Sequence, residues 1–326
     1  PPPEDPDYRE PAPYIMFAGQ PNGVIEDKNI TLTELGYRDA VPMPKPPDEF
    51  RIIILGGSTV FNGSPREVSI AGALESELHA QGYESGRIYN LGIFSTVSGQ
   101  ELATILFRAV DFDPDMILVY DGSNDLTEPY FFDPRPGYPF DFMANQGARR
   151  LIEGDYSLYD VYAVLLRPTN LGYTLFQFEI EEQITRRSQL DEIYENDRET
   201  WRRDIVTQYT ANLSKMCRMA SAFDFQFVAV LQPMIFFKDS LVGDEPGWQG
   251  SADYQNHTRA VYDLAREGFQ GLNEQYSSEP CLFRDGSRML ASEIDELFVD
   301  PVHLNDSGNV IIGRRLAGIL SPLLNP

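Results

Sequence analysis

Apolar and polar positions along the chain follow two different periods. Short, nearly continuous apolar runs predict buried strands at 51–55, 87–91, 116–120, 225–231 and 281–283. Apolar residues at helical spacing predict helices at 70–82, 98–110, 198–222 and 252–276, and a last helix that begins at Asp306 or Ser307. Ser98 is expected to cap the second of these helices, with Glu101 three residues later as in a capping box.

The regular alternation of strand and helix, with short links, is typical of a parallel sheet covered by helices. We therefore predict an α/β fold with a roughly five-stranded parallel sheet. Ligands of such open sheets bind at the carboxyl ends of the strands, so the residues that follow each strand are the first candidates for function.

Two segments fall outside this alternation. Residues 1–50 are rich in proline but contain apolar residues that need burial, so we expect an extended arm packed on the main domain, 51–326. Residues 126–195 begin with many aromatic residues, prolines and glycines, and we expect an insertion at the strand-end face. Its aromatic rings suit stacking on sugar rings or burial of an acyl chain, and equally suit packing on the core.

The charge of the chain narrows the classes of partner. The 326 residues include 50 acidic and 26 basic side chains, which gives a formal charge of −24. This field repels phosphate backbones and anionic surfaces, so we expect no nucleic-acid partner. It fits a neutral or cationic substrate, or a need for solubility alone. The sequence has no nucleotide-binding or zinc-protease motif, so we expect no cofactor and no catalytic metal.

The two cysteines leave the redox compartment open. Cys217 and Cys281 lie far apart in the sequence and form no metal-ligand cluster, so they either pair or remain as two separate buried thiols. The apolar runs are far shorter than the roughly 20 residues that span a bilayer. The chain begins at Pro1 without methionine, so we expect a trimmed or processed protein, for which an anchor upstream is one option.

Three histidines limit the choice of a catalytic base. His79 and His257 fall within predicted helices, where a surface position, or a lid for His257, is the simpler interpretation. Only His303 lies in a loop that has a carboxylate, Asp300, three residues earlier. A base for nucleophilic catalysis needs an imidazole whose far nitrogen is held by an acceptor, and Asp300 is able to supply one.

Three strand ends supply the partners that such a base requires. Ser58 follows the first strand, Gly92 the second and Asn124 the third. We predict Ser58 as the nucleophile, with the backbone N–H groups of Ser58 and Gly92 and the side-chain amide of Asn124 as oxyanion donors. Taken singly, each position is explained as well by an ordinary turn or by tight packing. Their joint occurrence, in this order, favours a catalytic site.

These segments resemble the sequence blocks of the SGNH (GDSL-like) hydrolases. Ser58 in Gly-Gly-Ser-Thr matches the nucleophile block, Gly92 in Asn-Leu-Gly the glycine block, and Asn124 in Gly-Ser-Asn-Asp the asparagine block; Asp300 and His303 match the Asp-x-x-His block. The resemblance covers about 50–125 and 225–322, and implies a flavodoxin-like three-layer α/β/α sandwich with these residues in the roles above. The family usually has aspartate before the nucleophile, whereas this chain has glycine.

A Ser–His–Asp site with oxyanion donors is equipped for acyl transfer. With water as the acceptor we expect an esterase that releases acetyl or short acyl groups from a small ester or a carbohydrate. With a sugar hydroxyl as the acceptor, the same serine would make the protein an O-acyltransferase. A third alternative is a non-catalytic SGNH-like binding domain. By analogy with the family, and with an anchor upstream as an option, we expect an extracytoplasmic location.

Overall fold

One parallel sheet forms the centre of the fold. The computed structural model describes residues 8–140, 142–156, 158–161 and 197–324. Five strands make up the sheet: β5 (Phe50–Leu55), β6 (Gly86–Asn90), β7 (Met116–Asp121), β8 (Gln226–Leu231) and β9 (Cys281–Asp285). Their order across the sheet is β6-β5-β7-β8-β9, and every neighbouring pair is parallel. This is the flavodoxin-like order, so the predicted fold class is confirmed.

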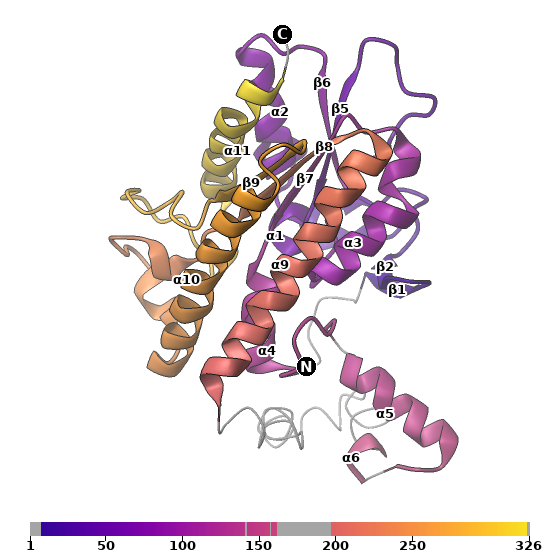
Figure 1. The fold of residues 1–326 in the computed structure, drawn as a ribbon, viewed down its shortest axis with the longest axis vertical. Helices are drawn as coiled ribbons and strands as arrows, with labels where there is room; N and C mark the ends of the chain where they lie inside the picture. Colours follow the sequence, from indigo (N-terminus) through magenta and orange to yellow (C-terminus); the bar gives the residue numbers. More distant parts are fainter. Residues whose placement is uncertain (1–7, 141, 157, 162–196, 325–326) are drawn as a thin grey trace.

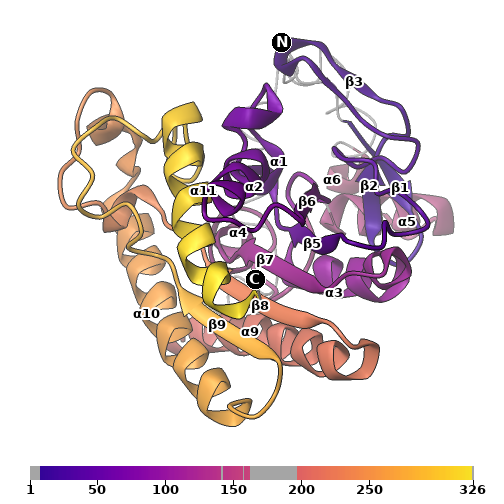
Figure 2. The ribbon, with the colours of Figure 1, turned by 90° about the horizontal axis from the view of Figure 1, so that it is seen from above.

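Helices cover both faces of the sheet, which gives three layers (Figure 1 and Figure 2). One face carries α2 (Ile70–Ala80) and α11 (Asp306–Leu320), which pack against each other. The other face carries α3 (Ser98–Phe107), α9 (Arg198–Phe223) and α10 (Ala252–Gln275). The central strands β7 and β8 are therefore buried on both sides, which explains why their sequences are continuously apolar instead of alternating.

One helix start differs from the prediction, and another agrees with it. Ser98 is the first residue of α3 instead of its cap; Val97 holds the cap position, and its N–H donates to the side chain of Gln100. α11 does begin at Asp306, but its cap is Asn305, whose side-chain oxygen accepts the N–H of Gly308. Ser98 does not cap the helix, because its N–H and its hydroxyl both donate hydrogen bonds to the buried carboxylate of Asp125.

The amino-terminal arm forms two small antiparallel ribbons. The first pairs β1 (Arg9–Ala12) with β2 (Met16–Gly19), and the second pairs β3 (Val24–Ile25) with β4 (Ile30–Thr31). Apolar residues of the arm form a small core of their own with Phe61 of the main domain; these are Tyr8, Ile25, Ile30 and Leu32. Burial of such side chains contributes about 1.5–3 kcal/mol each, enough to hold the arm in place.

The described part of the insertion lies beyond the carboxyl end of β7. It includes α4 (Ser123–Phe131), α5 (Phe142–Glu153) and α6 (Leu158–Val161), and α5 and α6 stand away from the sheet on the side of α4 (Figure 1). Residues 162–196, which complete the predicted insertion, lie outside the described residues.

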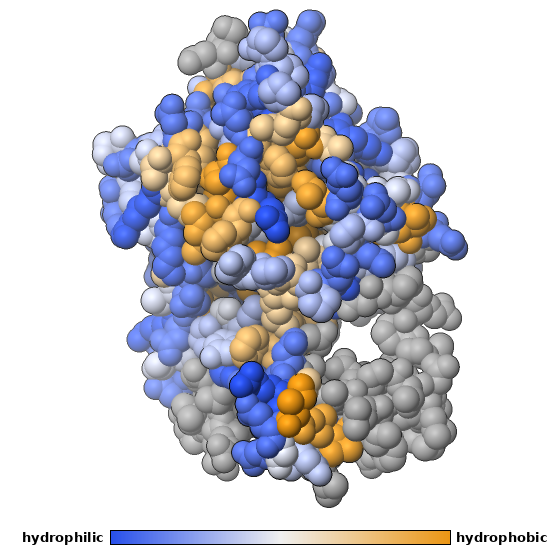
Figure 3. All heavy atoms as spheres, turned by 90° about the vertical axis from the view of Figure 1, so that its right-hand side faces the viewer, coloured by the Kyte–Doolittle hydropathy of each residue, from blue (hydrophilic) through white to orange (hydrophobic). Residues whose placement is uncertain are grey.

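Apolar side chains also gather on one outer face of the molecule. Figure 3 turns the side of α3 and the β1–β2 ribbon toward the viewer and shows apolar residues between polar ones. Tyr14 stacks on Phe107 with 4.4 Å between the ring centroids, and both rings are exposed. In the described part of the chain, no helix combines the length and apolar character needed to cross a membrane.

A disulfide decides between the two alternatives for the cysteines. Cys217 of α9 is bonded to Cys281, the first residue of β9. The bond joins a covering helix to the edge strand of the sheet, across 64 positions of sequence.

Removal of this cross-link is expected to lower the free energy of unfolding by about 4 kcal/mol, because the unfolded chain regains the entropy of an open loop. The double variant Cys217→Ala with Cys281→Ala tests this in urea denaturation at pH 7. Unchanged stability in that variant would mean that the disulfide contributes nothing to the fold.

Candidate active site

The turn after β5 presents Ser58 at the carboxyl end of the sheet. Gly56 has a φ of +157° and lies so close to β7 that a Cβ would come within 2.4 Å of the carbonyl oxygen of Tyr120. Only glycine fits this turn. Ser58 then opens the short helix α1 (Ser58–Phe61), where its N–H has no acceptor within the helix. Its side chain is partly exposed, as a nucleophile must be.

His303 and Asp300 meet Ser58 from the other end of the chain. The Oγ of Ser58 lies 2.6 Å from Nε2 of His303, and Nδ1 of His303 lies 2.5 Å from Oδ2 of Asp300. The second oxygen of Asp300 accepts the N–H groups of Val302 and His303 at 2.8 and 2.7 Å. The carboxylate therefore fixes both the imidazole and the backbone that carries it. The structure brings together all three residues that the sequence nominated.

The electrostatics of Asp300 suit this arrangement. Burial acts to raise the pKa of its carboxyl group, but the hydrogen bonds from His303 and from the backbone N–H groups outweigh burial. The pKa of Asp300 consequently lies below its usual range, so the group is a carboxylate at neutral pH. An ionised acceptor at Nδ1 leaves Nε2 free to take a proton from Ser58.

The amino-terminal arm forms part of the cavity around these residues. The cavity has a volume of about 620 Å³ and includes Ser58, His303, Phe94, Lys28 and Ile30 in its lining. The ammonium of Lys28 lies 4.7 Å from the centre of the Phe94 ring. Nothing in the sequence indicated this, because the proline-rich arm carries no motif that points to the site.

Asn124 lies beside the turn that carries Ser58. A Cβ placed on Gly57 would come within 2.6 Å of its Nδ2, so the amide lies against the turn that precedes Ser58. One of its two amide hydrogens is donated to the carbonyl of Thr96 at 2.7 Å. The other remains for a ligand.

Gly92 does not occupy the place that the sequence suggested. Its N–H donates to Oδ1 of Asn90 at 2.9 Å, and the residue is buried against Val60. Ser95, three residues later, lines the cavity instead. It has a φ of +56°, a left-handed conformation that is uncommon for serine and that orients this stretch of backbone toward the site.

His257 is not at the surface, and this prediction is wrong. Its ring has no exposed area and packs against the rings of Tyr130 and Trp201. Burial lowers its pKa to about 4, so it is neutral under ordinary conditions. His79 is half-buried, with Nε2 2.8 Å from the carbonyl oxygen of Gly86. Neither ring lies in the Ser58 cavity.

Three buried carboxyl groups lie behind the site. Asp125, next to Asn124, accepts the N–H of Ser98 at 2.7 Å and its hydroxyl at 2.5 Å. Burial raises the pKa of Asp125 to about 6. Burial, and next the charge of a neighbouring carboxyl, hold the pKa values of Glu101 and Asp121 well above the usual range. The folded protein therefore retains protons here that the unfolded chain releases.

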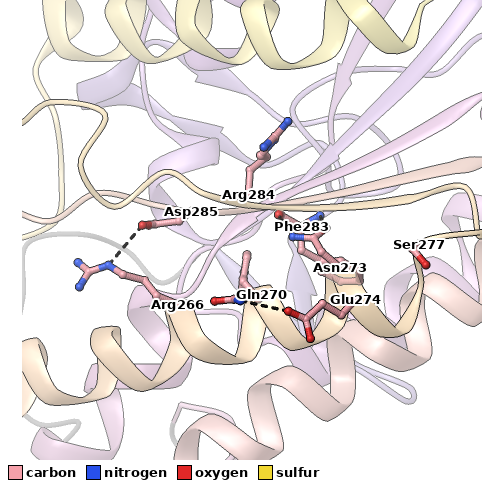
Figure 4. A pocket seen from close by; sticks show the side chains of 9 residues that line it. Arg266, Gln270, Asn273, Glu274, Ser277, Phe283, Arg284 and Asp285 are labelled. Atoms are coloured by element: carbon pink, nitrogen blue, oxygen red, sulfur yellow. Dashed lines mark hydrogen bonds and ion pairs between the residues drawn. The ribbon is translucent and has the colours of Figure 1, made fainter.

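A second cavity, of about 560 Å³, lies between α10 and β9 (Figure 4). Its polar groups pair with one another: Arg266 lies 3.3 Å from Asp285, and the amide of Asn273 bonds both backbone groups of Phe283. No triad residue lines it. Among the described residues, no group of three histidine, cysteine, aspartate or glutamate side chains is arranged to hold a metal ion.

The raised carboxyl pKa values predict how stability depends on pH. Since the folded state binds protons that unfolding releases, these groups stabilise the fold below pH 4 and lose this contribution as the pH rises, by about 1.4 kcal/mol per pH unit for each group. Asp121→Asn lacks one of these groups. Its free energy of unfolding, measured by chemical denaturation and compared with that of the wild type, should therefore rise between pH 4 and 8. Asp253→Asn is the control: hydrogen bonds from Arg198 and Tyr130 lower the pKa of Asp253, so its contribution changes only below about pH 4, and the stability of this variant relative to the wild type should stay nearly constant between pH 4 and 8.

Gly57→Ala is expected to lower kcat about tenfold with little effect on folding. The φ and ψ of Gly57, −80° and −150°, are accessible to alanine, so the new methyl group acts mainly by displacing the Asn124 amide. Ester hydrolysis and thermal unfolding, measured together, check this. Gly271→Ala, a helical position with no atom near the added methyl group, is the matched control and should keep full activity. An unchanged kcat in Gly57→Ala would show that the position of this amide is unimportant.

A scan against protein-family models finds no match for this chain, and no curated protein matches its sequence. Similar solved structures include a variant of an acetyl-xylooligosaccharide esterase from Geobacillus stearothermophilus, which is 13% identical with a TM-score of 0.47 over 85% of this chain and 94% of that one. A protein described as an acylhydrolase, from Bacteroides fragilis, is 13% identical with a TM-score of 0.42 over 87% and 92% of the two chains.

A further similar structure is a protein described as a lipolytic member of the G-D-S-L family, from Desulfitobacterium hafniense. It is 10% identical with a TM-score of 0.45 over 83% of this chain and 100% of that one. At identities this low, the chemistry of the protein has to be derived from its own site.

Proposed function

We propose that the protein is a serine esterase of the SGNH type, a member with glycine before the nucleophile, that hydrolyses acyl esters through an acyl-enzyme. The observation that carries the proposal is the unbroken chain of contacts from Asp300 through His303 to Ser58. A hydroxyl, an imidazole and a carboxylate in this order are the groups that nucleophilic acyl transfer needs.

The reaction has two halves. In the first, Nε2 of His303 takes the proton of Ser58 while Oγ attacks the acyl carbon, and the same nitrogen then gives that proton to the departing alcohol. In the second, water attacks the acyl-enzyme with His303 as the base, which releases the acid and restores the serine. Asp300 holds Nδ1–H throughout and stabilises the imidazolium.

The oxyanion that forms in each half needs donors. We assign the N–H of Ser58 and the free amide hydrogen of Asn124 to this role, as expected from the sequence. For the third donor we assign the N–H of Ser95 in place of Gly92, because the N–H of Gly92 is already bound to Asn90. Each such donor contributes about 10²–10³ in kcat in comparable enzymes.

The proposed substrate is an ester of an acetyl or short acyl group. A cavity lined by Phe94 and Ile30 beside Ser58 suits a small apolar acyl chain. The exposed rings of Phe131, Phe132 and Tyr138 suit stacking on sugar rings, so we propose a carbohydrate or cell-envelope polymer as the natural carrier of the acyl group. The disulfide supports an extracytoplasmic location, because disulfides persist in oxidising compartments.

Ser58→Ala is expected to lower the hydrolysis of p-nitrophenyl acetate by about 10⁴–10⁶-fold, because the acyl-enzyme no longer forms. Ser64→Ala removes another serine of the same cavity and should leave the rate within a few-fold of wild type. Equal rates of hydrolysis in the wild type and in Ser58→Ala would contradict the proposal and favour a binding role. Acylated product in the presence of a sugar acceptor would identify a transferase.

A further inference from the structure

A buried ion pair lies behind the loop that carries Asp300 and His303. Lys238 follows the short helix η5 (Ile235–Phe237), and Glu245 begins η6 (Glu245–Gln249). The Nζ of Lys238 is 2.5 Å from Oε2 of Glu245, and neither side chain has any exposed surface. Taking two charges out of water costs several kcal/mol per ion, so their other contacts must compensate.

These contacts converge on one stretch of backbone. Oε1 of Glu245 accepts the N–H groups of Leu297 and Phe298 at 2.9 and 3.2 Å. The ammonium of Lys238 donates to the carbonyl of Asp295. The ion pair thus holds the segment 295–298 at three points, immediately before the loop that carries Asp300 and His303, which we call the triad loop.

The held segment is one side of the stem of that loop. The N–H of Asn305 donates to the carbonyl of Leu297 at 2.8 Å, and Phe298 forms an antiparallel bridge with Leu304. The N–H of Val299 donates to the carbonyl of His303 at 3.0 Å. A displacement of the stem therefore moves Asp300 and His303 together.

A carboxylate and an ammonium suit this position better than apolar side chains would. An apolar pair of equal volume would leave the N–H groups of Leu297 and Phe298 and the carbonyl of Asp295 without these partners. Burial acts to raise the pKa of Glu245, but the bonds from Lys238 and the backbone outweigh it and hold the pKa below the usual range. The side chain of Glu245 is thus a carboxylate at neutral pH.

We propose that the ion pair of Lys238 and Glu245 positions the catalytic groups. It fixes the stem of the loop that carries Asp300 and His303, so that Nε2 of His303 remains within hydrogen-bond distance of Ser58. This inference rests on the proposed esterase function. Because misplacement of a catalytic group by about 1 Å costs up to 10²-fold in rate, loss of the pair should be visible in turnover by molecules that are still folded.

The test is Glu245→Gln, which keeps the shape of the side chain but removes its charge. Well below the melting temperature, and with active sites counted by a serine-reactive phosphonate, kcat for p-nitrophenyl acetate should fall about 10–100-fold. KM should stay within about threefold, because no substrate contact is lost. Amide hydrogen exchange at Leu297 and Phe298 should become faster, and this readout does not depend on the esterase proposal.

The matched control is Glu49→Gln. Glu49 forms another buried ion pair, with Arg51 at 2.6 Å, but it lies just before the start of β5, whereas Ser58 follows the end of that strand. Glu49→Gln should lower the melting temperature and leave kcat of the folded protein within about threefold of wild type. If Glu245→Gln and Glu49→Gln affect kcat equally, or if Glu245→Gln leaves kcat unchanged, the ion pair serves stability alone and the inference is wrong.

Two further outcomes are distinguishable. If Ser58→Ala retains full hydrolysis, the esterase proposal fails and this inference fails with it. If Ser58→Ala is inactive while Glu245→Gln is fully active, only the positioning role is wrong. Should Glu245→Gln not fold, Lys238→Arg takes its place under the same criteria, since it keeps the charge but changes the geometry of the pair.

Discussion

The hydrogen bond between Ser58 and His303 is the constraint on which the site depends. It joins side chains 245 positions apart in the sequence, so the end of β5 and the loop before α11 must meet at the same edge of the sheet. The parallel sheet makes this meeting possible, because all of its strands end at that edge. Helix α2, which comes after α1 and its following turn, packs on one face against α11, which comes after the loop of Asp300 and His303. Both halves of the site are thereby fixed to one rigid layer.

The elements around this constraint were largely accessible from the sequence. β7 and β8 are continuously apolar because helices cover both of their faces, and such runs are easy to recognise. Two glycines before a serine marked the turn after β5, and Asp300, three residues earlier, marked His303 as the candidate base. These signals are local in sequence, so they can be recognised without knowledge of the packing.

The remaining features arise from contacts between distant segments. His257 has polar neighbours in a helical stretch of the sequence, yet it is buried because Tyr130 of the insertion and Trp201 of α9 pack against it. Gly92 has the right spacing, but Asn90 takes its N–H, and Ser95 lines the cavity instead. A small apolar core that includes Phe61 holds residues 28 and 30 of the arm at the cavity. No sequence motif encodes this packing.

The paired amide of Asn273 has a consequence for the molecule as a whole. β9 is an edge strand, and an edge strand offers unpaired N–H and carbonyl groups to any other extended chain. At Phe283 both groups are taken by one side chain from α10, so the middle of the strand has no free pair to offer. At this edge the side-chain amide of Asn273 occupies the backbone groups that a sixth strand would pair with. It therefore opposes the edge-to-edge association that leads to aggregates.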